Sequence, residues 1–191
     1  GGLIFQQETP YHQASATQRF QGVSKIPLFV GQDAEWGLGQ MIDSTISFPR
    51  PLVLGALKND SMIYRMGHEI ARQMKMIGLN LNFGPSADVN NNPQDPLISY
   101  RSFGENKINV AGKATAFMRG LQDNGVLSCA KHFAVKGLTV VDFQKEFPII
   151  NASIDSVQAY PFLKLFENNV AGVMPASSSF PLFYENLKLT K

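Results

Sequence analysis

Five short apolar runs, separated by longer amphipathic and polar stretches, limit the folds that this sequence can adopt. They span residues 2–5, 26–30, 79–83, 126–130 and 171–174, and each is too short to form a typical helix. Their apolar residues are nearly continuous instead of alternating, which is typical of strands in a parallel sheet that is covered on both faces. The sequence therefore predicts parallel strands joined by crossover segments.

Amphipathic patterns with helical spacing lie between these runs. Residues 60–78 contain the clearest one, with Asp60 or Ser61 suited to the N-cap and Gly78 to the position after the last turn. Its periodic apolar side chains are Met62, Ile63, Met66, Ile70, Met74 and Ile77. We expect these methionines to fill the core, because methionine adapts to irregular gaps between helix and sheet.

Two further helical regions follow. Residues 109–125 repeat the same plan, and their apolar positions are Val110, Ala114, Phe117 and Leu121. A third region begins near Ser153, where Pro161 is expected to break one helix and start another. The alternation of strands and helices predicts the α/β class, and nothing resembling a linker divides the chain. We therefore expect a single domain over residues 1–191.

The composition excludes several classes of function. The chain has 191 residues, of which 44% are hydrophobic and 17% charged, so it can bury a substantial core. A net charge of +2 without a basic run gives no support for nucleic-acid binding. The apolar runs are far shorter than a membrane span. The single cysteine, Cys129, excludes an internal disulfide and is expected to be a buried small hydrophobe.

A polar cluster follows each of the last four apolar runs. The clusters are Gln32, Asp33 and Glu35; Asp88 and Asn90; Lys131 and His132; and Ser177, Ser178 and Ser179. Because the carboxyl ends of parallel strands share one face, we expect the clusters to converge on one pocket. The alternative is that each is an ordinary polar loop. Without a glycine-rich phosphate loop or a zinc-ligand pattern, the sequence predicts neither a cofactor nor a metal.

Five ordered segments closely resemble the N-terminal barrel of family 3 glycoside hydrolases. They are D-A-E-W-G at 33–37, F-P-R-P-L-V-L-G-A at 48–56, the stretch 78–106 with R-S-F-G, G-L-Q-D-N-G-V-L-S-C-A-K-H-F at 120–133, and G-V-M-P-A-S-S-S-F-P at 172–181. The most similar branch is that of the bacterial β-N-acetylglucosaminidases, also called β-N-acetylhexosaminidases. The resemblance covers nearly the whole chain.

The resemblance implies a TIM-type (β/α)8 barrel and retaining hydrolysis of terminal β-linked N-acetylglucosamine. It implies that Asp33, Arg101, Lys131 and His132 bind hydroxyl groups of the sugar, because fixed charged groups orient hydroxyls strongly. Trp36 can stack on a sugar face or pack at the rim. The implied partner is an N-acetylglucosamine-containing carbohydrate, and the compartment stays open between the bacterial cell envelope or periplasm and the cytoplasm.

The sequence departs from the family where catalysis is concerned. The family pattern has a catalytic histidine two residues after an aspartate, whereas this chain has Asp142 followed by Gln144. Glutamine cannot transfer a proton near neutral pH, and general acid–base catalysis is typically worth about 10²–10⁴-fold. The nucleophilic aspartate is expected on a strand beyond residue 191. We count about five or six of eight barrel units, to be completed by further segments or chains.

Two hypotheses follow, and a third is weaker. The first is a glycosidase whose full-length form supplies the nucleophile, with Asp142 as one candidate acid, and whose 191-residue segment alone is inactive. The second is a catalytically silent relative that binds sugar or has a structural role in an assembly. An unrelated barrel such as an aldolase would use Lys131 as a Schiff-base lysine, which the adjacent His132 and the family resemblance disfavour.

Overall fold

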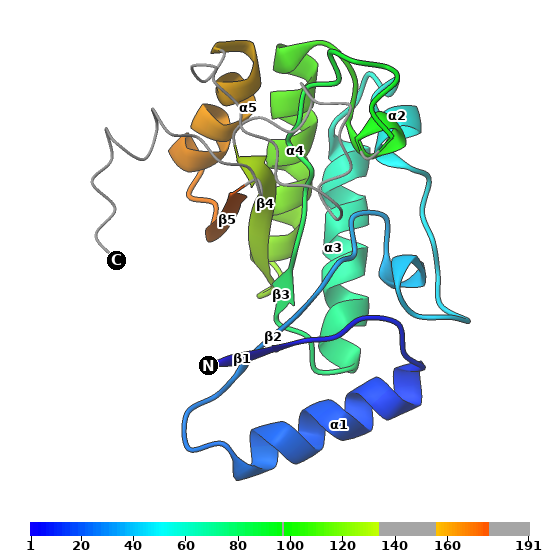
Figure 1. The fold of residues 1–191 in the computed structure, drawn as a ribbon, viewed down its shortest axis with the longest axis vertical. Helices are drawn as coiled ribbons and strands as arrows, with labels where there is room; N and C mark the ends of the chain where they lie inside the picture. Colours follow the sequence, from blue (N-terminus) through cyan, green and yellow to red (C-terminus); the bar gives the residue numbers. More distant parts are fainter. Residues whose placement is uncertain (97, 134–155, 176–191) are drawn as a thin grey trace.

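The computed structural model describes residues 1–96, 98–133 and 156–175, and it contains one parallel sheet (Figure 1). The strands follow the chain in the order β1-β2-β3-β4-β5, and every neighbouring pair is parallel. Their bounds are Gly2–Ile4, Phe29–Gln32, Leu81–Asn82, Leu127–Phe133 and Gly172–Pro175. Sequential parallel strands that curl with helices outside form an incomplete TIM-type barrel, which confirms the predicted class.

The predicted strand bounds need two corrections that matter for the site. β2 begins three residues later than expected, because Ile26 is largely exposed before the sheet and Gln32 is still paired within it. β4 extends through Lys131 and His132, which therefore lie in the strand and not after it. Apolarity alone gave the wrong bounds for β2 and β4, because a polar side chain at the carboxyl end of a barrel strand can still be buried.

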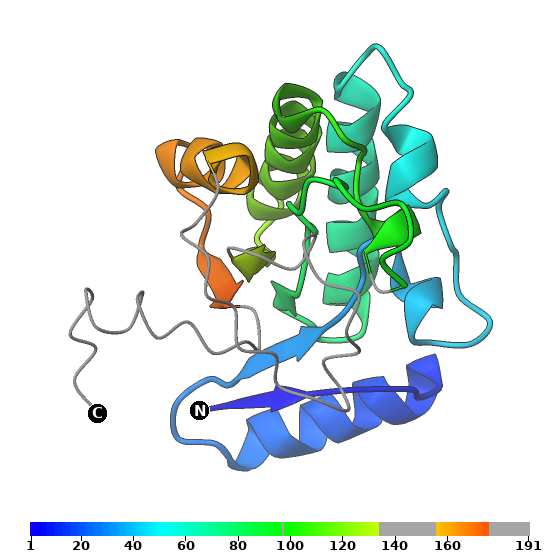
Figure 2. The same ribbon diagram turned by 45° about the horizontal axis from the view of Figure 1, so that its top comes forward.

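Helices cover the outer face of the sheet. Figure 1 shows α3, α4 and α5 side by side, whereas α1 lies at the other end of the molecule, and Figure 2 shows the same arrangement after rotation. Their bounds are Pro10–Val23 for α1, Pro51–Leu54 for the short α2, Ser61–Met76 for α3, Lys107–Gln122 for α4 and Ser156–Glu167 for α5. The 3-10 helices are Leu38–Gln40 and Ser99–Arg101.

α1 was not expected, because its sequence lacks an apolar stripe. Its start is nevertheless well defined: Pro10 occupies the first turn, and the Thr9 side chain accepts a hydrogen bond from the His12 amide at 3.3 Å. The residues that it buries are Gln13, whose Nε2 donates to Gln32 of β2 at 3.4 Å, and Thr17. Polar side chains on the inner face hid the helix from a search for hydrophobic periodicity.

α3 and α4 confirm the two helices predicted from apolar periodicity, and both contribute to the core. The apolar positions expected in α4 are all fully buried, and so are Ile63, Ile70 and Met74 of α3, while Met62 is exposed, contrary to expectation. Asp60 occupies the N-cap position without a capping side-chain bond, because Asn59 Oδ1 accepts from the Ser61 amide at 2.9 Å instead. Gly78 has a φ of 80°, as expected for the position after the helix.

Two further expectations are wrong. Pro161 does not divide the third helical region, because α5 continues through it and buries Pro161 with Phe162 and Leu165. That packing outweighs the one helical hydrogen bond that proline cannot donate. Cys129 is only half-buried, and burial still raises the pKa of its thiol. Within the described residues, no helix is both long and apolar enough to cross a membrane.

Candidate functional site

Three of the side chains predicted to bind sugar form a chain of ionic contacts that also includes Glu35. Lys131 of β4 contacts Asp33, in the loop after β2, and its Nζ lies 2.8 Å from Glu35 Oε1. Arg101 reaches the same carboxylate from the loop after β3, with Nη2 at 2.6 Å from Oε1. We call Asp33, Glu35, Arg101 and Lys131 the ion network. It joins residues up to 98 positions apart in sequence, as the prediction of convergence requires.

Burial controls the electrostatics of the ion network. The side chains of Glu35 and Lys131 are 1% and 3% exposed, whereas that of Asp33 is 31% exposed. Burial alone would raise the pKa of Glu35, but the charges of Lys131 and Arg101 outweigh it and lower this pKa to about 2. Glu35 is therefore ionised at neutral pH, and Asp33 is the acceptor most open to a ligand.

The loop that carries Asp33 and Glu35 is fixed by amide side chains. Asn82, at the end of β3, donates from Nδ2 to the Ala34 carbonyl at 3.0 Å, and its Oδ1 accepts from the Ala34 amide at 3.2 Å. Gln40 Oε1 accepts from the Glu35 amide at 2.7 Å. Because the backbone on both sides of Ala34 is held in this way, the two carboxylates are positioned before any ligand arrives.

His132 forms a second pair beside the ion network. Its Nδ1 lies 3.0 Å from Asp88 Oδ2, and Ser86 Oγ donates to the same oxygen at 2.7 Å. Burial opposes ionisation of Asp88, but the His132 charge and hydrogen bond prevail and lower the pKa of this carboxyl. The register of β4 against β5 shifts between Lys131 and Phe133, and such a bulge re-aims side chains at the end of a strand.

Glu35 and Asp88 belong to the predicted polar clusters, although neither is among the predicted site residues. Both are almost completely buried and ionised, and each orients a predicted ligand: Glu35 holds Lys131 and Arg101, and Asp88 holds His132. The feature of the sequence that could have identified them is their position after predicted strands. The expected sugar-binding residues came from the family resemblance, whereas the carboxylates that hold them become visible only from burial and pairing in the structure.

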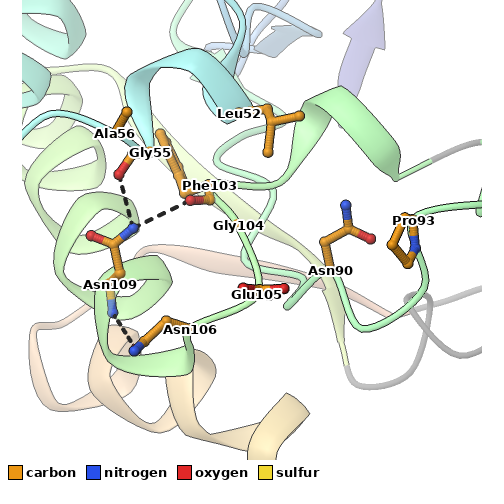
Figure 3. A pocket seen from close by; sticks show the side chains of 10 residues that line it. All are labelled: Leu52, Gly55, Ala56, Asn90, Pro93, Phe103, Gly104, Glu105, Asn106 and Asn109. Atoms are coloured by element: carbon orange, nitrogen blue, oxygen red, sulfur yellow. Dashed lines mark hydrogen bonds between the residues drawn. The ribbon is translucent and has the colours of Figure 1, made fainter.

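Two other members of the predicted clusters point elsewhere. Gln32 is buried and donates to the Gln6 carbonyl at 2.9 Å, so it ties β2 to the segment after β1. Asn90 lines a separate pocket of about 360 Å³ between α2 and the start of α4 (Figure 3). There Asn109 Nδ2 donates to the carbonyls of Gly55 and Phe103 at 3.0 and 3.3 Å. Neither Gln32 nor Asn90 belongs to the ion network.

Trp36 packs at the rim of the site. It is 7% exposed, and the Arg50 guanidinium lies over its ring at 3.7 Å from the centroid. Tyr100 meets the tryptophan edge-on at a centroid distance of 6.2 Å. Of the two roles considered for Trp36, the structure supports packing, because Arg50 already covers a face of the indole.

Asp142 and Gln144 lie outside the described residues, as do the serines at 177–179. The catalytic expectations attached to them therefore stay predictions. Across residues 1–96, 98–133 and 156–175, no group of three or more histidine, cysteine or acidic side chains is arranged to hold a metal ion. The described part of the site consists instead of ionic and hydrogen-bonding groups suited to hydroxyls.

Comparisons with known proteins place these residues in a family. Residues 3–185 match the profile "Glycosyl hydrolase family 3 N terminal domain". β-Hexosaminidase A of Pseudoalteromonas piscicida is 31% identical over 84% of this chain and 28% of its own length. A family 3 β-N-acetylglucosaminidase from a Paenibacillus species has a TM-score of 0.85 at 29% identity, over 95% of this chain and 36% of that chain.

NagZ of Neisseria gonorrhoeae has a TM-score of 0.84 at 26% identity, over 95% of this chain and 56% of that chain. The chain thus spans between about a quarter and somewhat over half of these relatives. Because the profile covers almost every residue, and the fold and the order of motifs agree with it, the chain belongs to glycosyl hydrolase family 3, to whose N-terminal domain it corresponds.

Proposed function

We propose that the protein as naturally made removes terminal β-linked N-acetylglucosamine from carbohydrates with retention of configuration. Family membership and the printed names of the relatives, β-hexosaminidases and β-N-acetylglucosaminidases, support the reaction class. The observation that carries the proposal is the ion network. It holds one acceptor, Asp33, and two cationic donors, Lys131 and Arg101, around a buried carboxylate.

The ion network suits a neutral ligand with many hydroxyls. Asp33 accepts hydrogen bonds from two hydroxyls, while Arg101, Lys131 and His132 donate to others. Since Asp33, Glu35 and Asp88 already neutralise these cations, no net charge on the sugar is needed. Hydrogen bonds to charged groups are stronger than neutral ones, so a few such contacts can fix one sugar ring.

Retaining hydrolysis proceeds through two displacements. A carboxylate attacks the anomeric carbon while an acid protonates the leaving oxygen, and water then cleaves the glycosyl-enzyme with help from the same acid acting as a base. In this proposal the nucleophile comes from outside the 191 residues, and Asp142 is the candidate acid in place of the histidine that Gln144 replaces. The described residues bind the sugar and orient its anomeric carbon.

The test is a calorimetric titration of N-acetylglucosamine into the natural protein and its Asp33→Asn variant. We expect the variant to bind at least about tenfold more weakly, because an ionised acceptor is exchanged for a neutral one. Asp43→Asn is the matched control, since Asp43 is an exposed acid in the same connection between β2 and α2. Equal affinity in the Asp33 variant and the wild type would refute the assignment.

A catalytically silent sugar-binding protein is the second candidate, and Gln144 is the observation that favours it. Hydrolysis of 4-nitrophenyl N-acetyl-β-glucosaminide separates the two candidates. Turnover that is lost in Asp33→Asn supports the glycosidase. Binding of N-acetylglucosamine without turnover supports the silent relative, and replacing Gln144 with histidine would then show whether the acid is what the site lacks.

A further inference from the structure

Arg50 is an exposed cation that aromatic rings hold at the rim of the site. Its guanidinium carbon lies 3.7 Å from the centroid of the Trp36 ring and 4.8 Å from that of Tyr100. The two rings meet at 70°, so the guanidinium occupies the corner between them. Aromatic contacts of this kind orient the planar group but leave its N–H edges free to donate.

The backbone of Arg50 is also fixed. Arg50 precedes α2, and its carbonyl accepts from the amides of Val53 and Leu54 at 3.0 and 3.2 Å. Pro51 restricts the first turn of that helix. Both ends of the side chain are therefore held, which reduces the conformational entropy lost when a ligand binds.

Arg50 has no acidic partner within residues 1–96, 98–133 and 156–175. Arg101, the arginine of the ion network, is by contrast paired: its Nη2 lies 2.6 Å from Glu35 Oε1. The salt bridges of the described residues leave Arg50 out, and its side chain donates none of their hydrogen bonds. An oriented guanidinium without a carboxylate is complementary to an anionic group of a ligand.

Chain connectivity places this cation just outside the ion network. Trp36 follows Glu35 directly, and Tyr100 precedes Arg101, so each aromatic ring is the neighbour of an ion-network residue. The exposed fraction increases from the ion network toward Arg50: it is 1% for Glu35, 7% for Trp36 and 45% for Tyr100. A ligand group beside Arg50 would thus be one step further toward solvent than a sugar held by the ion network.

We propose that Arg50, oriented by Trp36 and Tyr100, binds an anionic group, carboxylate or phosphate, on the portion of the substrate beyond the terminal sugar. The inference rests on the proposed function, because it assigns the ion network to the terminal sugar. It makes Arg50 a specificity-determining residue for the leaving group. Substrates with a negative charge on that group bind better than neutral ones of the same shape.

The test uses two non-hydrolysable thioglycosides of N-acetyl-β-glucosamine, 4-nitrophenyl and 4-carboxyphenyl, which differ mainly in charge. We expect the natural protein to bind the carboxyphenyl compound about threefold to tenfold more tightly at low salt, as for a charge-assisted contact at an exposed position. Arg50→Gln should abolish the preference, and Arg50→Lys should keep part of it. A 4-phosphophenyl analogue shows which anion is preferred.

Arg19→Gln is the matched control. Arg19 is an exposed arginine over the ring of Phe20 at 5.1 Å, but it lies on α1, at the end of the molecule opposite α2 in Figure 1. It should leave the preference intact. Equal binding of the two thioglycosides, or a preference that survives in Arg50→Gln, overturns the inference while the proposed function stands. Failure of both thioglycosides and of N-acetylglucosamine to bind would refute the proposed function and the inference together.

Discussion

Replacing Glu35 with glutamine tests whether this carboxylate holds the ion network together. The substitution keeps the shape of the side chain but leaves Lys131 and Arg101 without their shared counter-charge. Lowering the pKa from 4.5 to about 2 corresponds to roughly 3 kcal/mol in favour of the folded state with ionised Glu35. Breaking a buried ion pair typically costs about 3–5 kcal/mol, so we expect Glu35→Gln to lower the free energy of unfolding by about 3 kcal/mol at pH 7.

The pH dependence follows from the sign of this shift. The folded-state pKa of Glu35 lies below the unfolded value, so its contribution is fully present above pH 4.5. It is lost progressively as the pH falls toward about 2, because the unfolded chain then binds the proton more tightly. Asp88 also has a lowered pKa, but it is unchanged in the variant. The difference between wild type and Glu35→Gln therefore isolates Glu35.

Urea unfolding between pH 2 and 7, followed by the fluorescence of Trp36, measures this difference. Trp36 is the only tryptophan of the chain and is adjacent to Glu35. Glu69→Gln is the control: its pKa is also lowered to about 2, mainly by hydrogen bonds from Arg72, but its side chain is 35% exposed. Solvent screening should make its effect much smaller. Equal costs for the two substitutions, or a Glu35→Gln variant that is as stable as wild type at pH 7, would refute the reasoning.

Two further predictions concern packing and a buried lysine. Gly120→Ala should lower the unfolding free energy by about 1–3 kcal/mol. The added Cβ on α4 would lie 2.2 Å from the Tyr64 carbonyl oxygen of α3. Gly22→Ala, where nothing lies within 4 Å, should instead stabilise by about 0.4–1 kcal/mol, and thermal melting of both variants checks the contrast. Lys113→Met should cost about 1–2 kcal/mol in urea unfolding, since the buried ammonium donates to the Leu57 carbonyl at 2.7 Å and to Asp60 at 2.8 Å. An unchanged midpoint for Lys113→Met, matching that of the exposed Lys164→Met control, would contradict this role.

The strand–helix alternation was readable from the sequence because strands buried on both faces need apolar residues at nearly every position. The exact strand ends were not readable, since burial at the carboxyl edge depends on partners from other strands. Lys131 shows the difference: the sequence alone suggests a polar residue after β4, whereas Asp33 and Glu35 allow it to be buried within the strand. Apolar periodicity did not predict α1 for a related reason: the side chains that this helix buries are polar.

Topology predicted the convergence of Asp33 and Lys131, and the family resemblance added Arg101, but neither predicted the roles of Glu35 and Arg50. Residue type suggests that each could contact a ligand. Only the structure shows that Glu35 is almost inaccessible and fully paired, whereas Arg50 is exposed and lacks a carboxylate partner among the described residues. Pairing and exposure, which decide whether a charge supports a site or meets a ligand, depend on contacts made between distant segments.

Burying the charged side chains of the ion network is an inefficient way to stabilise the fold. Burying Glu35 and Lys131 removes both from water, and replacing such pairs by well-packed apolar residues is often neutral or stabilising. A gain in stability is thus a weak reason for the ion network to exist. A gain in orientation is a better one, because the network leaves Asp33 and the edge of Arg101 directed by fixed partners instead of by flexible side chains. The free-energy cost of burying these charges is therefore offset by a higher affinity for a ligand that binds without rearrangement of the site.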